Sequence, residues 1–222
     1  MNAPPPLVLG IDTSTVVNVG LAFGATVLAT ATENDARAHV EELMPLVMRC
    51  LTAAGHRLSD VDQIVVGLGP GPFTGLRVGI ATARVISTVL STPLHGICSL
   101  DVIAGQHLAE SPGDEDFIVA TDARRREAYW ARYRSGRRVA GPHVSGPADV
   151  PALPVIGPAA GLYPDRLSVT SGPRSLNPGA LARFGTSLPA AGTEPLYLRR
   201  ADASEPSRRK SVLVRRPSGP RR

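Results

Sequence analysis

The chain has 222 residues, of which 43% are apolar and only 4% are aromatic, which is enough for a large core of aliphatic side chains. No uninterrupted apolar run reaches the roughly 18 residues that span a bilayer, and the first residues lack the basic start of a signal peptide. We therefore expect a cytoplasmic protein that has no membrane partner. Two cysteines are too few for a disulfide scaffold or a cysteine zinc site.

The net charge of +5 is distributed unevenly. Residues 1–121 are acidic overall, residues 122–207 are basic, and residues 208–222 carry seven basic and no acidic side chains. Because this end has no periodic apolar face, we expect residues 206–222 to form a disordered basic tail. Such a tail can attract RNA through its phosphates, or it can be a solvated end without a partner.

The first half of the chain alternates between strand and helix patterns. Apolar or alternating runs predict strands over 7–11, 17–23, 26–33, 63–68 and 94–98. Spacings of three and four predict helices over 36–54, 76–90 and 99–110, with Pro45 as a kink or a tightened turn inside the first. We assign this βββαβαβα order to a first lobe of residues 1–110.

A weaker copy of the pattern begins at residue 117. Strands are expected at 117–121 and 127–134. The range 141–178, rich in Pro and Gly, leaves room only for short strands near Val155 and Val169, before a short helix capped by Asn177. A duplicated βββαβα unit is typical of the actin-like ATPase and sugar-kinase folds. We therefore predict an α/β protein of this class with a reduced second lobe over 111–205.

Both early helices are too apolar to pack on one sheet alone. The apolar arc of helix 36–54 is about 200° wide, whereas a sheet covers a stripe of little more than 100°. Helix 76–90 has two apolar strips, one with Val78, Val85 and Val89 and one with Leu76, Ile80, Ala83, Ile86 and Leu90. We expect one side to pack on the sheet and the other to bind a partner protein; alternatively, this chain buries both sides.

Small residues support the hypothesis of a helix-to-helix interface. The spacing of Gly75, Gly79 and Ala83 by four would let a partner helix approach closely, and methionines adapt to varied contacts. We expect Gly79→Arg to abolish partner binding and to leave the fold intact. The predicted interface residues are Val40, Met44, Val47, Met48, Gly75, Val78, Gly79, Thr82, Val85, Ile86 and Val89.

Candidates for chemistry are few. Asp12, Thr13 and Ser14 follow the first strand and could meet a phosphate or a metal-bound water, although a structural turn explains them equally well. The glycine-rich stretch 67–79 lacks the Gly-Lys-Ser/Thr of a Walker A loop, and its two prolines remove amide donors that a phosphate needs.

The remaining polar groups also give weak signals. His39 is followed four residues later by Leu43 and not by a second histidine, so we expect no metal site. A basic run, Arg124–Arg126 with Arg132, Arg134, Arg137 and Arg138, borders the aromatic side chains Tyr129, Trp130 and Tyr133. This run could contact RNA, the acidic surface of a partner, or only solvent.

Several motifs together resemble the bacterial TsaB (YeaZ) family: IDTST at 11–15, GLGPGPFTGLRVG at 67–79, GICSLDVIA at 96–104, DARRREAYWARY at 122–133 and PLYLR at 195–199. The resemblance implies a non-catalytic actin-like protein that pairs with a catalytic paralogue, TsaD, and a small ATPase, TsaE. Together they transfer a threonylcarbamoyl group to the adenosine next to the anticodon of tRNAs that read codons beginning with A.

The resemblance also implies how the chain assembles. Family members pair through the two early helices, so we expect a homodimer when the chain is alone, and ATP and Mg²⁺ only at the level of the complex. The paralogue's His-x-x-x-His metal pair corresponds to His39 and Leu43, which agrees with a lost active site.

Two other functions remain open from the sequence. An ATP-dependent phosphotransferase would use Asp12 and Asp122 around magnesium, although 141–178 has no glycine-rich adenosine loop. A peptidase would need a metal pair or a nucleophile that the sequence does not offer.

Overall fold

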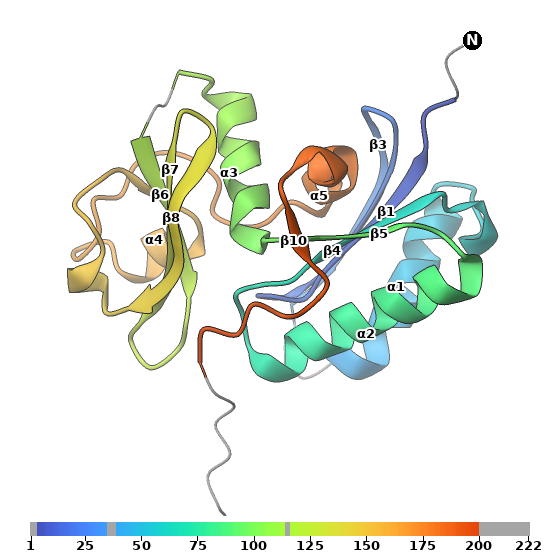
Figure 1. Cartoon of the computed structure of the whole chain (residues 1–222), viewed down its shortest axis with the longest axis horizontal. Helices are drawn as coiled ribbons and strands as arrows, with labels where there is room; N and C mark the ends of the chain where they lie inside the picture. Colours follow the sequence, from blue (N-terminus) through green and yellow to red (C-terminus); the bar gives the residue numbers. More distant parts are fainter. Residues whose placement is uncertain (1–3, 35–38, 114–115, 200–222) are drawn as a thin grey trace, which may run out of the picture.

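The computed structural model describes residues 4–34, 39–113 and 116–199, and of residues 39–41 it describes only the backbone. Its two sheets form two lobes, which lie side by side in Figure 1. The first sheet has the strand order β10-β5-β4-β1-β2-β3, and the second has the order β8-β7-β6-β9. This confirms the predicted α/β class with a smaller second sheet.

The first sheet combines an antiparallel meander with a parallel centre. Its strands are β1 Leu7–Asp12, β2 Val17–Phe23, β3 Thr26–Glu33, β4 Gln63–Gly67, β5 Leu94–Ile97 and β10 Ala190–Gly192. β1, β2 and β3 are antiparallel neighbours, whereas β1, β4 and β5 pair in parallel and therefore need long crossovers. β1 is buried along its whole length, which explains its unbroken apolar sequence.

Helices cover both faces of the first sheet (Figure 1). α1 His39–Ala53 and α2 Phe73–Leu90 lie on one face, where Leu9 and Ile11 of β1 join their core. α3 Ser99–Glu110 and α5 Pro178–Phe184 lie on the other face. Because α3 also packs on β6 and β7, its apolar side chains connect the cores of the two lobes.

The second lobe holds β6 Asp116–Asp122, β7 Ala128–Arg134, β8 Arg137–Ser145, β9 Val155–Ile156 and helix α4 Pro158–Leu162. The short strands expected near Val155 and Val169 are present as β9 and an isolated bridge to it. The sequence did not predict β8, because Gly141-Pro142 lies within it. β8 is an edge strand, where the missing N–H of a proline is tolerated.

After the second lobe the chain returns to the first. The side chain of Asn177 caps α5, as predicted, by accepting hydrogen bonds from the amides of Gly179 and Ala180. α5 packs on β1, β2 and β3, and a Cβ at Gly20 would overlap the carbonyl oxygen of Pro178. β10 then pairs with β5. Residues 178–192 therefore lie on the first sheet, although the sequence analysis assigned them to the predicted second lobe, 111–205.

One detail of the helices differs from expectation. α2 begins at Phe73, directly after Pro72, and not at 76. α1 continues through Pro45, while its expected start at 36 falls outside the described residues. The remaining short helices are η1 Leu58–Asp60, η2 Pro147–Asp149 and η3 Gly185–Ser187.

The sequence of α2 is apolar over most of its length. By length and composition alone, α2 is the one described helix that could span a membrane, although it contains no uninterrupted apolar run of that length. Arg77 and Arg84 interrupt its sequence. In this structure its inner side, with Ile80 and Ala83, packs on the first sheet.

Candidate functional site

Asp12, the first candidate residue, lies at the end of β1 and is fully buried. Its Oδ1 accepts hydrogen bonds from the amide of Ser14 at 2.9 Å and from the Ser14 hydroxyl at 2.6 Å. Its Oδ2 accepts a hydrogen bond from the hydroxyl of Ser99 at 2.5 Å, and the amide of Gly69 donates to that same hydroxyl oxygen. The carboxyl group therefore ties the turn after β1 to the glycine-rich loop and to the start of α3.

Thr13 is held in the same closed turn. Its hydroxyl donates to the carbonyl of Gly75, inside α2, at 2.7 Å. A Cβ at Gly79 would overlap Thr13 Oγ1, and a Cβ at Gly67 would overlap Asp12 Oδ2. These glycines therefore serve to bring α2 and the loop against the turn.

Burial affects the protonation of Asp12. Loss of hydration raises the pKa of Asp12 above its usual value, and the hydrogen bonds from Ser14 and Ser99 offset part of this rise. A magnesium ion would need a carboxylate that it can reach, and Asp12 has no accessible surface. Of the two interpretations of this turn, the geometry favours the structural one.

We expect Asp12→Asn to preserve the fold. An asparagine keeps Oδ1 as the acceptor for Ser14 and can donate to Ser99 Oγ, and it avoids burying a charge. Because the pKa of Asp12 is raised in the folded state, its stabilising contribution is complete below the unfolded pKa of about 4 and is lost as pH rises through the folded value. The stability of the variant relative to wild type should therefore increase with pH, as measured by urea unfolding at several pH values.

Two outcomes would contradict this account of Asp12. One is a stability difference between Asp12→Asn and wild type that is constant or decreases with pH. The other is saturable binding of magnesium ATP by the wild-type chain alone that Asp12→Asn abolishes, which would favour the phosphotransferase hypothesis.

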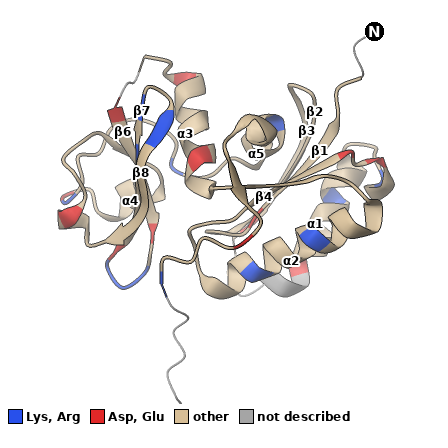
Figure 2. Cartoon of the chain, in the orientation of Figure 1, with Lys and Arg blue, Asp and Glu red and all other residues tan. Residues whose placement is uncertain are grey.

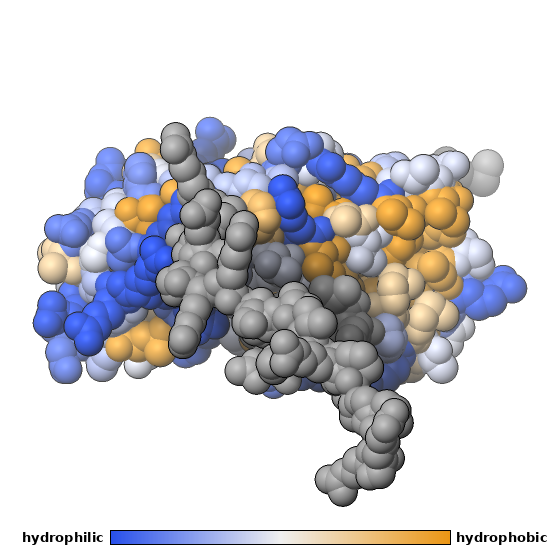
Figure 3. Space-filling model, turned by 90° about the horizontal axis from the view of Figure 1, so that it is seen from below, coloured by the Kyte–Doolittle hydropathy of each residue, from blue (hydrophilic) through white to orange (hydrophobic). Residues whose placement is uncertain are grey.

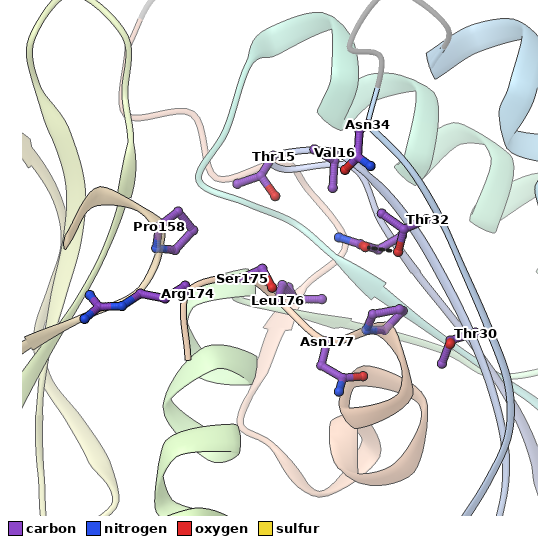
Figure 4. Close-up of a pocket in the computed structure, with 12 residues that line it drawn as sticks. Thr15, Val16, Thr30, Thr32, Asn34, Pro158, Arg174, Ser175, Leu176 and Asn177 are labelled. Atoms are coloured by element: carbon purple, nitrogen blue, oxygen red, sulfur yellow. Dashed lines mark hydrogen bonds between the residues drawn. The ribbon is translucent and has the colours of Figure 1, made fainter. Parts of the chain in front are cut away.

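A pocket of about 500 Å³ lies between the two lobes (Figure 4). Thr15, Thr32 and Asn34 lie on its first-lobe side, and Pro158 and Arg174 lie across from them. None of its lining residues is acidic. Within the described ranges, no group of three or more His, Cys, Asp or Glu side chains could hold a metal ion. The pocket therefore suits a small polar molecule, but its lining offers no carboxylate for magnesium.

None of the lining residues of this pocket was a predicted site residue. Asn18 is buried in β2, and its Oδ1 accepts a hydrogen bond from the hydroxyl of Thr32 at 3.0 Å. Its Nδ2 has no hydrogen-bond partner among the described residues. Its signal in the sequence is a polar amide within an otherwise apolar strand.

A second candidate site is an apolar surface on the opposite side of the first sheet from α3 and α5. We call it the helix face and define it by Met44 and Met48 of α1 with Val85 and Val89 of α2, whose exposed fractions are 37, 44, 62 and 73%. α1 and α2 pack against each other, and the apolar area lies over these helices in Figure 3. Contiguous exposed apolar side chains of this kind mark interaction sites.

A C-terminal segment borders the helix face. Arg84 forms an ion pair with Glu194 at 2.6 Å and donates to the carbonyl of Thr193. The Nε of Arg77 donates to the hydroxyl of Tyr197, whose ring stacks on Phe73 with centroids 4.9 Å apart. No local sequence pattern indicates these contacts, because they join residues more than 100 positions apart.

The structure corrects the predicted interface. Val47, Gly75, Gly79 and Ile86 are buried within the chain. Val78 and Thr82 are half-buried, and the side chain of Val40 lies outside the described residues. Because Gly79 faces Thr13, Gly79→Arg cannot leave the fold intact. The two apolar strips of α2 are real, but the glycines belong to the strip that packs on this chain's own turn.

The structure also shows where the aromatic side chains beside the basic run lie. Tyr129, Trp130 and Tyr133 are buried in the second lobe, so they cannot stack on RNA bases. Arg132 and Arg134 both pair with Asp116, and these arginines hold the pKa of that carboxyl well below its usual range. The side chain of His39 lies outside the described residues, so the expectation about a metal there stays a prediction.

Comparison with known proteins adds three findings. A family model described as TsaD, tRNA N6-adenosine threonylcarbamoyltransferase, matches residues 26–177. An uncharacterized protein of Mycobacterium tuberculosis is 44% identical over 202 residues, which cover 88% of this chain and 93% of the relative. The tRNA threonylcarbamoyladenosine biosynthesis protein TsaB of Escherichia coli is 36% identical over 128 residues, which cover 57% of this chain and 54% of that protein.

A solved structure agrees with these relatives. YeaZ from Pseudomonas aeruginosa superposes with a TM-score of 0.70 at 27% identity, covering 87% of this chain and all of that chain. The two-lobed architecture is the actin-like ATPase fold that the sequence predicted.

Proposed function

Because this chain belongs to the TsaB (YeaZ) family, we propose that it takes part in tRNA threonylcarbamoyladenosine biosynthesis as a non-catalytic subunit. In this role it binds the catalytic paralogue, a TsaD-type protein, and supports threonylcarbamoyl transfer to the adenosine 3′ of the anticodon. A TsaE-type ATPase is the third component. The complex works in the cytoplasm, where its tRNA substrates are.

The helix face is the observation that carries this proposal. Four apolar side chains on two adjacent helices remain in contact with water in the isolated chain. Each fully exposed side chain of this size gains about 1.5–3 kcal/mol when a partner covers it. The exposed arginines Arg49 of α1 and Arg77 of α2 favour a partner that also carries acidic groups.

The turn at Asp12 supports a role without catalysis. The carboxyl group is buried and its hydrogen bonds hold the chain's own loops together. The chemistry is then done by the paralogue, with ATP and magnesium bound at the level of the complex and no cofactor held tightly by this chain.

The helix face also accounts for a homodimer when the chain is alone. A two-fold pair uses the same patch on both copies, so a second copy covers the apolar side chains until the paralogue replaces it. Sedimentation of the isolated chain should then show a dimer that the paralogue converts into a heterodimer.

Reconstitution tests the proposed function. The full-length chain is combined with its TsaD-type and TsaE-type partners, ATP, threonylcarbamoyl-adenylate and a tRNA that reads codons beginning with A. We expect omission of this chain to lower the initial rate of adenosine modification, measured by mass spectrometry, by at least tenfold, which corresponds to about 1.4 kcal/mol in the barrier of the overall reaction. An undiminished rate without this chain, or modification by this chain alone, would refute the proposal.

A further inference from the structure

The tight turn between β6 and β7 exposes three consecutive arginines, Arg124, Arg125 and Arg126. We call this segment the arginine turn. All three residues have left-handed backbone angles, with φ of 60, 54 and 61°. Each such conformation costs an L-amino acid about 1–2 kcal/mol. A run of three persists only where the surrounding structure imposes it, and such strained segments concentrate at functional sites.

The contacts around the arginine turn fix its backbone and leave its side chains outside. The amide of Ala123 donates to the carbonyl of Glu127, and the amide of Glu127 donates to the carbonyl of Arg124. Asp122 accepts a hydrogen bond from the amide of Arg124 at 2.8 Å. Arg199, from the end of the described chain, pairs with Glu127 and donates to the carbonyl of Ala123.

Of the other four arginines in the basic run, three pair with carboxyl groups, and the fourth, Arg137, is exposed at the start of β8. Arg132 and Arg134 bind Asp116, and Arg138 lies 3.1 Å from the carboxyl group of Asp101. Arg124 also has an ion pair, with Asp122 at 3.4 Å, but 71% of its side chain remains exposed. The positive charge that this hairpin presents to a partner is therefore centred on the arginine turn.

The arginine turn is flanked by residues that contact Arg199, the last residue that the structure describes. Arg199 holds the end of the described chain against residues 123–127, and residues 208–222 add seven basic and no acidic side chains. Figure 2 shows the basic turn at the lower edge of the second lobe. In Figure 3, polar surface of the second lobe and apolar surface over α1 and α2 occur on the same side of the molecule. A partner on the helix face would therefore share this side with whatever the arginines bind.

We propose that the arginine turn binds phosphate groups of the RNA backbone, and that this chain thereby helps to hold the tRNA on which the complex acts. The inference rests on the proposed function for the identity of the RNA. Guanidinium groups bind phosphates with paired, charge-assisted hydrogen bonds. Such contacts position RNA without reading its sequence. Residues 208–222 add seven basic and no acidic side chains to the sequence, and this composition favours a long polyanion over a compact acidic protein surface.

Salt-dependent tRNA binding tests this proposal. The anisotropy of a labelled tRNA is measured with the full-length chain, alone and bound to its paralogue, at several salt concentrations. The variant Arg124→Gln/Arg125→Gln/Arg126→Gln should lower affinity by at least about tenfold and reduce the slope of log affinity against log salt by about 2–3, because each lost phosphate contact removes close to one unit. Arg124→Lys/Arg125→Lys/Arg126→Lys keeps the charges and should keep most of the slope.

A matched control separates a local site from net charge. Arg57→Gln/Arg166→Gln/Arg183→Gln removes the same three charges from exposed positions elsewhere, and it should change the slope by less than about one unit. A chain that ends at Ser207 should also bind tRNA more weakly. Thermal unfolding of each variant confirms that the fold is kept.

The proposal is overturned if the glutamine variant of the arginine turn and its control bind tRNA equally. It is also overturned if that variant loses the paralogue but keeps tRNA, since the turn would then contact protein. A different result would contradict the proposed function itself. In the reconstitution, the rate of adenosine modification would then stay unchanged when this chain is omitted, whatever its affinity for tRNA.

Discussion

Met48→Glu combined with Val85→Glu will abolish binding of this chain to its catalytic partner. The two positions lie on different helices of the helix face, so the substitutions place two carboxylates at the centre of the proposed interface. Burying an unpaired carboxylate costs several kcal/mol, and each 1.4 kcal/mol is tenfold in affinity. We therefore expect a loss of at least about 1,000-fold, measured by titration of the purified proteins.

The same double variant should keep its fold. Both side chains are largely exposed, and glutamate is a good helix former, so the free energy of unfolding should change by less than about 1 kcal/mol. The control Ala109→Glu/Thr186→Glu adds the same two charges at exposed positions on the α3 and α5 side of the sheet. Normal partner binding by the helix-face variant, or an equal loss in the control, would show that the partner binds elsewhere.

Gly79→Ala will destabilise the chain although alanine is the better helix former. The added Cβ overlaps the hydroxyl oxygen of Thr13, which is buried and hydrogen-bonded to Gly75. Overpacking costs about 1–3 kcal/mol and a disturbed buried hydrogen bond costs about 1–3 kcal/mol, whereas helix propensity returns about 1 kcal/mol. We expect the free energy of unfolding, from urea denaturation, to fall by about 3 kcal/mol.

A double-mutant cycle identifies the cause of this loss. Thr13→Ala removes Oγ1 and Cγ2, the two atoms that lie nearest to the new methyl group. The double variant should therefore be more stable than the sum of the two single effects by at least about 1 kcal/mol. Gly161→Ala is the control, because nothing lies within 4 Å of a Cβ at that position in α4. Additive effects at Gly79 and Thr13 would mean that the glycine is needed for another reason.

The strands and helices of the first lobe could be predicted from the sequence because their patterns are local. The sequence of β1 is an almost unbroken apolar run, because helices cover both faces of the sheet at this strand and all of its residues are buried. β8 could not be predicted, because Gly141-Pro142 is typical of a turn and only its edge position permits a strand there. The return of α5 to the first sheet depends on the fit of Pro178 against Gly20, a contact between distant parts of the chain.

The candidate sites were predictable to a smaller extent. Periodicity revealed that α2 has two apolar strips, and the structure shows that one is covered and that Val85 and Val89 of the other are exposed. Periodicity alone could not show which strip faces inward, since the side chains of both strips are apolar. The sequence alone could not decide whether Asp12 belongs to a phosphate site or to a structural turn. That distinction depends on the burial of Asp12 and on its hydrogen bond with Ser99, which lies 87 positions away.

The most direct test of the account is a photo-crosslink from the helix face in the reconstituted complex. A photoreactive amino acid replaces Val89, which is 73% exposed, or Ala109 on the opposite side of the sheet. Our account predicts a crosslink to the TsaD-type subunit from position 89 and none from position 109. A crosslink from position 109 with none from position 89 would contradict it, because the partner would then lie on the other side of the first sheet.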